Sequence, residues 1–177
     1  MTYRDQLQRL GETTANRVVV VFDDYSSGDL TLDEAVALIA AIIAKANGTA
    51  VALADLSLAA TLMLQTGQPV PTLGLLPPTE DPDRLLKAAA TLLAVEHLTT
   101  ERVARLGRSE PLESAARAYS DGIRQNPAVT GWTRQVSPNA CQVCQDLAGD
   151  VLPDTVPMYH HTGCTCTPIP VTKETAA

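Results

Sequence analysis

The cysteines and histidines of this chain are crowded into one short segment near its C-terminal end. All four cysteines and two of the three histidines fall between Cys141 and Cys166 of the 177-residue sequence. Cys141 and Cys144 form a C-x2-C pair, in which two thiolates can reach one ion, and a second Cys/His group follows after a loop. The segment therefore predicts a tetrahedral metal site with sulfur and nitrogen ligands.

More side chains are present than such a site can use. The second group offers two adjacent histidines and two cysteines one residue apart, so the choice within each pair stays open. The expected ligands are Cys141, Cys144, His161 and Cys164, with Cys166 and His160 as alternates.

The expected ion is a structural Zn²⁺. Residues 131–171 contain few large apolar side chains, and ordering a segment of about 40 residues costs roughly 1.5 kcal/mol per residue. A structural zinc contributes roughly 10–16 kcal/mol in small finger peptides, which is the right order to offset that cost. Disulfides are the alternative. They would leave the interleaved histidines without a role, and the first residues lack the apolar run of a secretory signal, so we expect a reducing cytoplasm.

No catalytic pattern accompanies the cysteines in the sequence. There is no H-E-x-x-H motif, and His97 is followed by Leu98 and Thr99 rather than by the H-x-E order of nucleobase deaminases. No βαβ pattern surrounds the C-x2-C pair, as a thioredoxin-like role would require. We therefore expect a structural metal and no enzymatic activity.

The chain before the cysteines has the composition of a helical protein. Alanine and leucine dominate it, and only 3% of all residues are aromatic. Apolar spacing and capping residues predict helices over residues 2–25, 31–47 and 50–65. A fourth helix is predicted to be capped by Asp81 and to carry an apolar stripe that reaches Leu106, and a fifth to run from Ser109 to Asn126.

The most apolar stretch lies between Ala50 and Leu64. Asp55 interrupts it, and it is too short to span a bilayer of about 30 Å. We therefore expect a buried helix and no membrane partner.

A Pro-rich apolar segment covers about residues 67–82. Its prolines and glycines oppose regular structure, so it is either a flexible linker or an extended arm laid across a partner. Its four aliphatic side chains make it too apolar for a solvated tether, and this favours the arm.

The composition of the sequence changes after Pro127, where Thr, Val, Pro and Gly become frequent and short strands are expected. The predicted fold is mainly α, with a helical body (1–127) followed by a small zinc-stapled β-rich C-terminal module (128–177). Within the module, Trp132 is expected to anchor the strands on the helices. Arg134 is expected either to pair with Asp146 or Asp150 and orient the C-x2-C pair, or to be solvated.

Several C-terminal motifs occur together in a specific order and spacing: Gly131-Trp132-x-Arg134, Cys141-x2-Cys144, Leu147, Gly149, Tyr159-His-His161-x2-Cys164-x-Cys166 and Pro168-x-Pro-Val171. Together they resemble the C-terminal signature of the Mu F-like minor capsid proteins, the head morphogenesis proteins of tailed bacteriophages, in the form found in phages of actinobacteria. The doubled histidine departs from the usual single one of the family and leaves the histidine ligand open.

The resemblance implies a structural virion component that is present in few copies. It would be made in the host cytoplasm and would act in assembly at the portal or on the inner capsid surface, with capsid or portal subunits as partners. The net charge of −7 makes nucleic acid an unlikely partner, because phosphate contacts need Lys or Arg. The alternative is a cellular zinc-knuckle adaptor for a protein or nucleic acid. It predicts basic residues or exposed aromatics at the knuckle, yet none of the residues from Cys141 to Cys166 is basic and only Tyr159 is aromatic.

Overall fold

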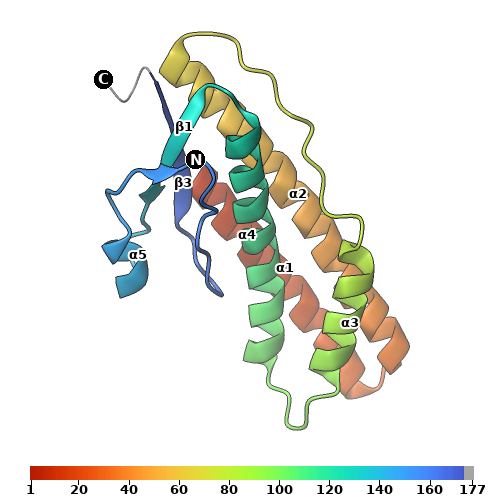
Figure 1. Ribbon diagram of the computed structural model, residues 1–177. Helices are drawn as coiled ribbons and strands as arrows, with labels where there is room; N and C mark the ends of the chain where they lie inside the picture. The colour runs from red at the N-terminus through yellow and green to blue at the C-terminus, as the bar shows by residue number, and fades with distance from the viewer. Residues whose placement is uncertain (174–177) are drawn as a thin grey trace.

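The computed structural model describes residues 1–173, and its helices and strands occupy two regions. Four long helices run side by side as a bundle, and a small three-stranded sheet with one short helix lies against one end of the bundle (Figure 1). The prediction of a mainly α fold with a small β-containing C-terminal region is confirmed. Residues 174–177, the last four of the predicted module, lie outside the described part of the chain.

Helix α1 (Tyr3–Ser27) agrees with the helix predicted for residues 2–25. It begins with a capping box: the Thr2 hydroxyl accepts a hydrogen bond from the Asp5 N–H, and the Asp5 carboxylate accepts one from the Thr2 N–H. Its valine-rich stretch has strand propensity. The stretch is nevertheless helical, because Val18 and Val21 lie about one turn apart and are both buried in the bundle.

Helix α2 (Leu32–Thr66) is one continuous helix of 35 residues, so the predicted interruption at Asn47 and Gly48 is wrong. Asn47 is fully buried, and its side-chain Nδ2 donates a hydrogen bond to the Asp81 carboxylate at 2.9 Å. Gly48 does not adopt the left-handed conformation that would end a helix. The Asn-Gly pair is therefore a packing feature here and not a helix end.

Helix α3 (Asp81–Leu93) starts with Asp81 inside its first turn, so the predicted N-cap is wrong. Glu80 occupies the N-cap position without a side-chain hydrogen bond. The Asp81 carboxylate is buried and accepts hydrogen bonds from Asn47 and from the guanidinium of Arg84. Asp81 thus connects α3 to α2 instead of capping α3.

Helix α4 (Thr100–Gln125) begins well before the predicted start at Ser109. The apolar stripe predicted to extend one helix to Leu106 therefore belongs to two helices, α3 and α4. Thr99 caps α4 by accepting a backbone N–H, and Pro111 lies inside the helix, where its missing N–H removes one backbone hydrogen bond. The helix continues through this proline because its buried face extends on both sides of it.

The apolar character of α2 is largely explained by the bundle. Along its length, from Ala35 to Leu62, α2 buries side chains while packing against α1, α3 and α4. By length and composition alone, α2 is apolar enough to cross a membrane, a test that the core helix of a soluble protein also passes.

Residues 67–80, the Pro-rich segment, run in an extended path from α2 to α3 along the outside of the bundle (Figure 1). The buried carboxylate of Asp55 accepts the backbone N–H groups of Leu73, Gly74 and Leu75. The segment is extended, as expected of an arm, but the surface on which it lies belongs to its own chain.

The sheet has the strand order β2-β1-β3, and both pairings are antiparallel. Its central strand is β1 (Val129–Gln135), flanked by β2 (Leu152–Pro153) and β3 (Thr167–Thr172). The short helix α5 (Gln142–Asp146) lies between β1 and β2 in the chain. Strands are therefore found in the stretches on both sides of the cysteines, where they are expected.

One hydrophobic cluster joins the sheet to the helices. At its centre Trp132 is 1% exposed, and its indole Nε1 donates a hydrogen bond to the Val156 carbonyl at 2.7 Å. The C-terminal region thus shares a core with α2 and α4. The buried members of this core are Val51, Ala54, Leu58, Leu62, Ala118, Tyr119, Ile123, Val129, Trp132, Cys144, Met158, Cys164 and Cys166.

Candidate metal centre

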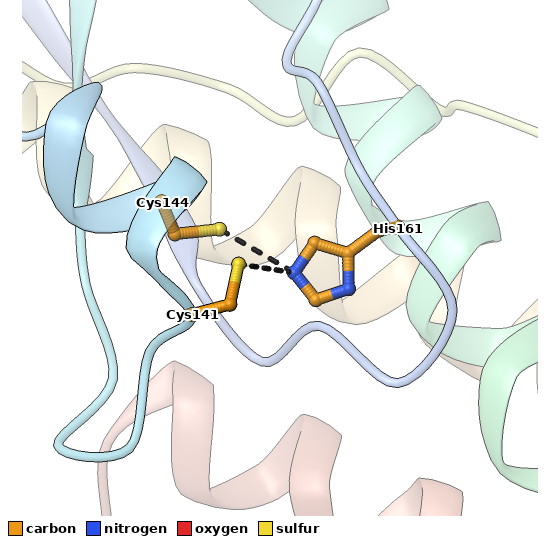
Figure 2. Close-up of side chains that lie close together, drawn as sticks. All are labelled: Cys141, Cys144 and His161. Atoms are coloured by element: carbon orange, nitrogen blue, oxygen red, sulfur yellow. Dashed lines mark hydrogen bonds between the residues drawn. The ribbon is translucent and has the colours of Figure 1, made fainter.

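Cys141 and Cys144 are held on one helical turn at the start of α5, with both sulfurs directed to the same neighbour (Figure 2). Cys141 is the N-cap residue, and its carbonyl accepts the Gln145 N–H at 3.0 Å. The Gln145 side chain also donates to the Ala140 carbonyl at 2.7 Å, which braces the turn. Cys144 is fully buried while Cys141 is exposed, so the pair has one sulfur in the core and one toward solvent.

His161 comes from the loop before β3 and points its ring at the two cysteines (Figure 2). Its Nε2 lies 3.2 Å from the Cys141 Sγ and 3.5 Å from the Cys144 Sγ. Its Nδ1 lies 3.2 Å from the Thr162 carbonyl oxygen. Because a carbonyl only accepts, this contact assigns the proton to Nδ1 and leaves the Nε2 lone pair facing the sulfurs. These three side chains could hold a metal ion.

Cys164 and Cys166 form a second group with the same Cys144. The Sγ atoms of Cys144 and Cys164 are 3.7 Å apart, and the three sulfurs all lie within 4.8 Å of one another. All four cysteines are free, and 3.7 Å is far longer than the disulfide bond length of about 2.05 Å. Five sulfur and nitrogen donors are thus brought together, and they are called the Cys/His cluster below: Cys141, Cys144, His161, Cys164 and Cys166.

Crowding and burial alter the acidity of these thiols. Burial and the neighbouring cysteines raise the pKa of the Cys144 thiol well above its ordinary value, and burial raises the pKa of Cys164. Burial also acts to raise the pKa of Cys166, but hydrogen bonds with Ser137, Cys144 and Cys164 together outweigh it and lower that pKa. A cation at the cluster would oppose the effect of burial, because positive charge favours the thiolate form.

His160, the alternate histidine ligand, lies outside both groups of donors. Its Nε2 donates to the Cys164 carbonyl at 3.0 Å, and burial lowers the pKa of its imidazole. It therefore braces the backbone that carries Cys164, whereas its neighbour His161 faces the sulfurs.

Arg134 contacts the cluster directly, and the described residues give it no pairing with Asp146 or Asp150. The side chain is buried, its Nη2 donates to the Tyr159 carbonyl at 2.6 Å, and its Nη1 lies 3.6 Å from the Cys144 Sγ. Both the predicted aspartate partners and the predicted solvated position are therefore wrong, because the side chain points into the core shared with Trp132.

Two contacts of the site were missed by sequence reasoning. Ser137 donates its N–H to the Cys166 sulfur at 3.5 Å, and Tyr159 supplies a backbone carbonyl to Arg134. Every residue type except proline has an N–H and every one has a carbonyl, so neither contact leaves a mark in the residue pattern.

A cleft of about 390 Å³ opens beside the cluster. It lies between the start of α1, which contributes Arg4 and Asp5, and the loops that carry Cys141 and His161. An ion arriving from solvent can therefore reach these two side chains without crossing the hydrophobic core.

The chain was compared with protein-family models, curated proteins and solved structures, and none of them gives a significant match. The resemblance to the Mu F-like proteins therefore rests on the C-terminal motifs alone. Those motifs and the geometry of the Cys/His cluster are the features of the chain that bear on its function.

Proposed function

We propose that the chain is a structural, non-enzymatic minor capsid protein of a tailed bacteriophage, and that its Cys/His cluster binds one structural Zn²⁺. It acts in head morphogenesis at or near the portal or the inner capsid surface, after synthesis in the host cytoplasm, and its partners are capsid or portal subunits. One observation carries the proposal: the Cys and His donors of the Mu F-like motif form two groups of three that share Cys144.

The separations within the cluster suit zinc. Tetrahedral zinc, with Zn–S bonds of about 2.3 Å and Zn–N bonds of about 2.0–2.1 Å, puts two sulfurs about 3.8 Å apart and a sulfur and a nitrogen about 3.5 Å apart. The sulfurs of Cys144 and Cys164 are 3.7 Å apart. The His161 Nε2 is 3.2 Å and 3.5 Å from its two sulfur neighbours. These side chains therefore need only small movements to take up the ion.

A structural role for the ion follows from the number of donors. A catalytic zinc keeps one position open for water or substrate, whereas a structural zinc is enclosed by four protein ligands. Five donors are available for four places, so protein groups can fill the coordination shell. Three of the sulfurs also belong to the core around Trp132, where an ion would tie α5 to the loop before β3.

Elemental analysis of the purified protein, with a thiol count before and after chelation, tests the metal centre. We expect one zinc per chain and thiols that react freely only after the zinc is removed. Cys144→Ser should abolish tight binding, because Cys144 belongs to both donor groups, and of Cys164→Ser and Cys166→Ser one should retain zinc. His161→Ala should weaken binding, and the matched control His160→Ala should not. A metal-free protein with freely reactive thiols would contradict the zinc assignment.

Mass spectrometry of purified particles of the phage that encodes the chain tests the capsid assignment. Its peptides should be present at few copies relative to the major capsid protein. Cross-linking in intact heads should join them to portal or capsid subunits. Peptides found in the infected-cell lysate but missing from purified particles would contradict the capsid role and leave the zinc centre standing.

A further inference from the structure

Arg134 is a buried cation without an acidic partner in the described residues 1–173. Its side chain belongs to a residue only 4% exposed, and no carboxylate lies within ion-pair distance of it there. It contacts the Tyr159 carbonyl and the Cys144 sulfur, its guanidinium lies 5.8 Å from the Trp132 ring centroid, and its Nε has no hydrogen-bond partner. A charge buried in this way is strongly destabilising unless a counter-charge lies close by.

The Cys/His cluster is the available source of that counter-charge. Zinc bound by three thiolates and one neutral imidazole carries a net charge of about −1, and zinc bound by four thiolates about −2. One guanidinium neutralises the first centre and leaves the second with a buried negative charge. Neutral thiols or disulfides would leave the guanidinium with no anion at all.

We propose that Arg134 is the charge partner of the metal centre and favours a ligand set of three thiolates with His161 over a set of four thiolates. The inference rests on the zinc centre proposed above and adds its charge and ligand count. In this arrangement Arg134 faces the shared ligand Cys144 through Nη1, while Nη2 is fixed by the Tyr159 carbonyl. One of Cys164 and Cys166 then stays a neutral thiol beside the ion.

The first test compares zinc affinities of the full-length protein and two variants, measured by competition with a chromophoric chelator. Arg134→Gln removes the charge and keeps hydrogen-bonding groups, and we expect affinity to fall about 10–100-fold, as for other groups that support metal ligands. Arg134→Lys keeps the charge and should stay within a few-fold of the wild type. The optical spectrum of the Co²⁺-loaded wild type should show three thiolate ligands, and a four-thiolate spectrum would overturn the inference.

A second test separates charge from packing. Cys141 is the exposed cysteine of the cluster, so a larger histidine side chain is accommodated most easily at this position. Cys141→His converts the centre to two thiolates and two imidazoles, which with Zn²⁺ carry no net charge. In this background Arg134→Gln should no longer weaken zinc binding. A purely structural role for Arg134 would give the same loss of affinity in both backgrounds.

The outcomes separate the inference from the function on which it rests. If the wild type binds no zinc, the proposed metal centre fails. If the wild type binds zinc and Arg134→Gln binds it equally well, only the role of Arg134 fails. If the single variant Arg134→Gln does not fold, the double variant that carries both Arg134→Gln and Cys141→His should still fold and bind zinc. A double variant that does not fold or does not bind zinc would also overturn the role of Arg134.

Discussion

Replacing Asp55 by asparagine should release the Pro-rich segment from α2. Asp55 is 5% exposed, and its carboxylate accepts the N–H groups of Leu73 at 2.8 Å, Gly74 at 2.7 Å and Leu75 at 3.1 Å. Asparagine keeps one acceptor oxygen but turns an NH₂ group, itself a donor, toward the remaining N–H groups. The substitution therefore removes the charge and at least one of the three hydrogen bonds with little change in volume.

The expected loss can be worked from these contacts. A hydrogen bond to a charged group contributes about 1.5–3 kcal/mol and a neutral one about 1 kcal/mol. Leu73 is 40% exposed, so water can reach the segment and partly replace what is lost. We expect the free energy of unfolding to fall by about 3 kcal/mol. For a chain of this size, that loss corresponds to a fall in Tm of roughly 6–12 °C.

Urea unfolding of the metal-loaded protein, followed by circular dichroism, measures the global change. Hydrogen exchange measures the local one, because the amides of residues 73–75 should exchange faster in the variant. Asp23→Asn, which alters an exposed carboxylate on α1, is the control and should change stability by less than about 0.5 kcal/mol. Unchanged stability together with unchanged exchange at the three amides would refute the reasoning, since the carboxylate would then not hold the segment.

Four further predictions concern packing and metal removal. Gly122→Ala should destabilise the fold by about 1–3 kcal/mol, because its Cβ would lie 2.5 Å from the Leu58 Cδ2. Gly48→Ala should instead stabilise α2 by about 0.5–1 kcal/mol, because no atom lies within 4 Å of the position that its Cβ would take. Urea unfolding compares the two variants, and equal effects on stability would contradict the packing described. Trp132→Phe should cost about 2–4 kcal/mol in the same assay, because it leaves a cavity and an unpaired Val156 carbonyl; a loss below 1 kcal/mol would argue against a central role for this indole. Chelation should open α5 and the loop before β3 to protease while most helical circular dichroism persists, and a parallel loss of helix would contradict this expectation.

The elements that sequence reasoning predicted well are those whose evidence is local. The start of α1 is a capping box, and the start of α2 has the Thr31–Glu34 spacing of the same motif. The start of each helix is therefore encoded within four residues. The valine-rich part of α1 was harder, since its propensity favours a strand, but the apolar spacing on either side of it is helical.

The errors at Asn47 and Asp81 share one physical cause, which is a partner far away in the chain. Asn47 stays inside a helix because its side chain is bonded to Asp81, which lies 34 residues further on. The same contact takes Asp81 out of its expected capping role. Local propensity cannot report such a contact, because the residue types alone fit both a helix end and a buried hydrogen bond.

In the candidate site, too, local spacing was informative and contacts with distant partners were not foreseen. The spacing of the C-x2-C pair and of His161 is a local property, and these three side chains do lie together, while the choice between Cys164 and Cys166 as a ligand stays a prediction. Arg134 was expected to be paired with an aspartate or solvated, yet it is buried against a sulfur and a backbone carbonyl. Neither partner can be inferred from charge pattern, since one is a main-chain atom and the other is neutral without a metal.

The shared core limits the part of the fold that a bound metal would have to stabilise. A C-terminal region with so few apolar residues was predicted to depend on zinc as a whole, but β3 packs on α2 and α4, and Trp132 on β1 is buried among their side chains. The strands therefore have a source of stability that is independent of an ion. The short helix α5 instead meets the core through Cys144, and the loop before β3 meets it through Met158 and Cys164. An ion bound at the Cys/His cluster would mainly fix α5 and that loop to each other, so the surface around them is the part of the protein whose shape would depend on metal.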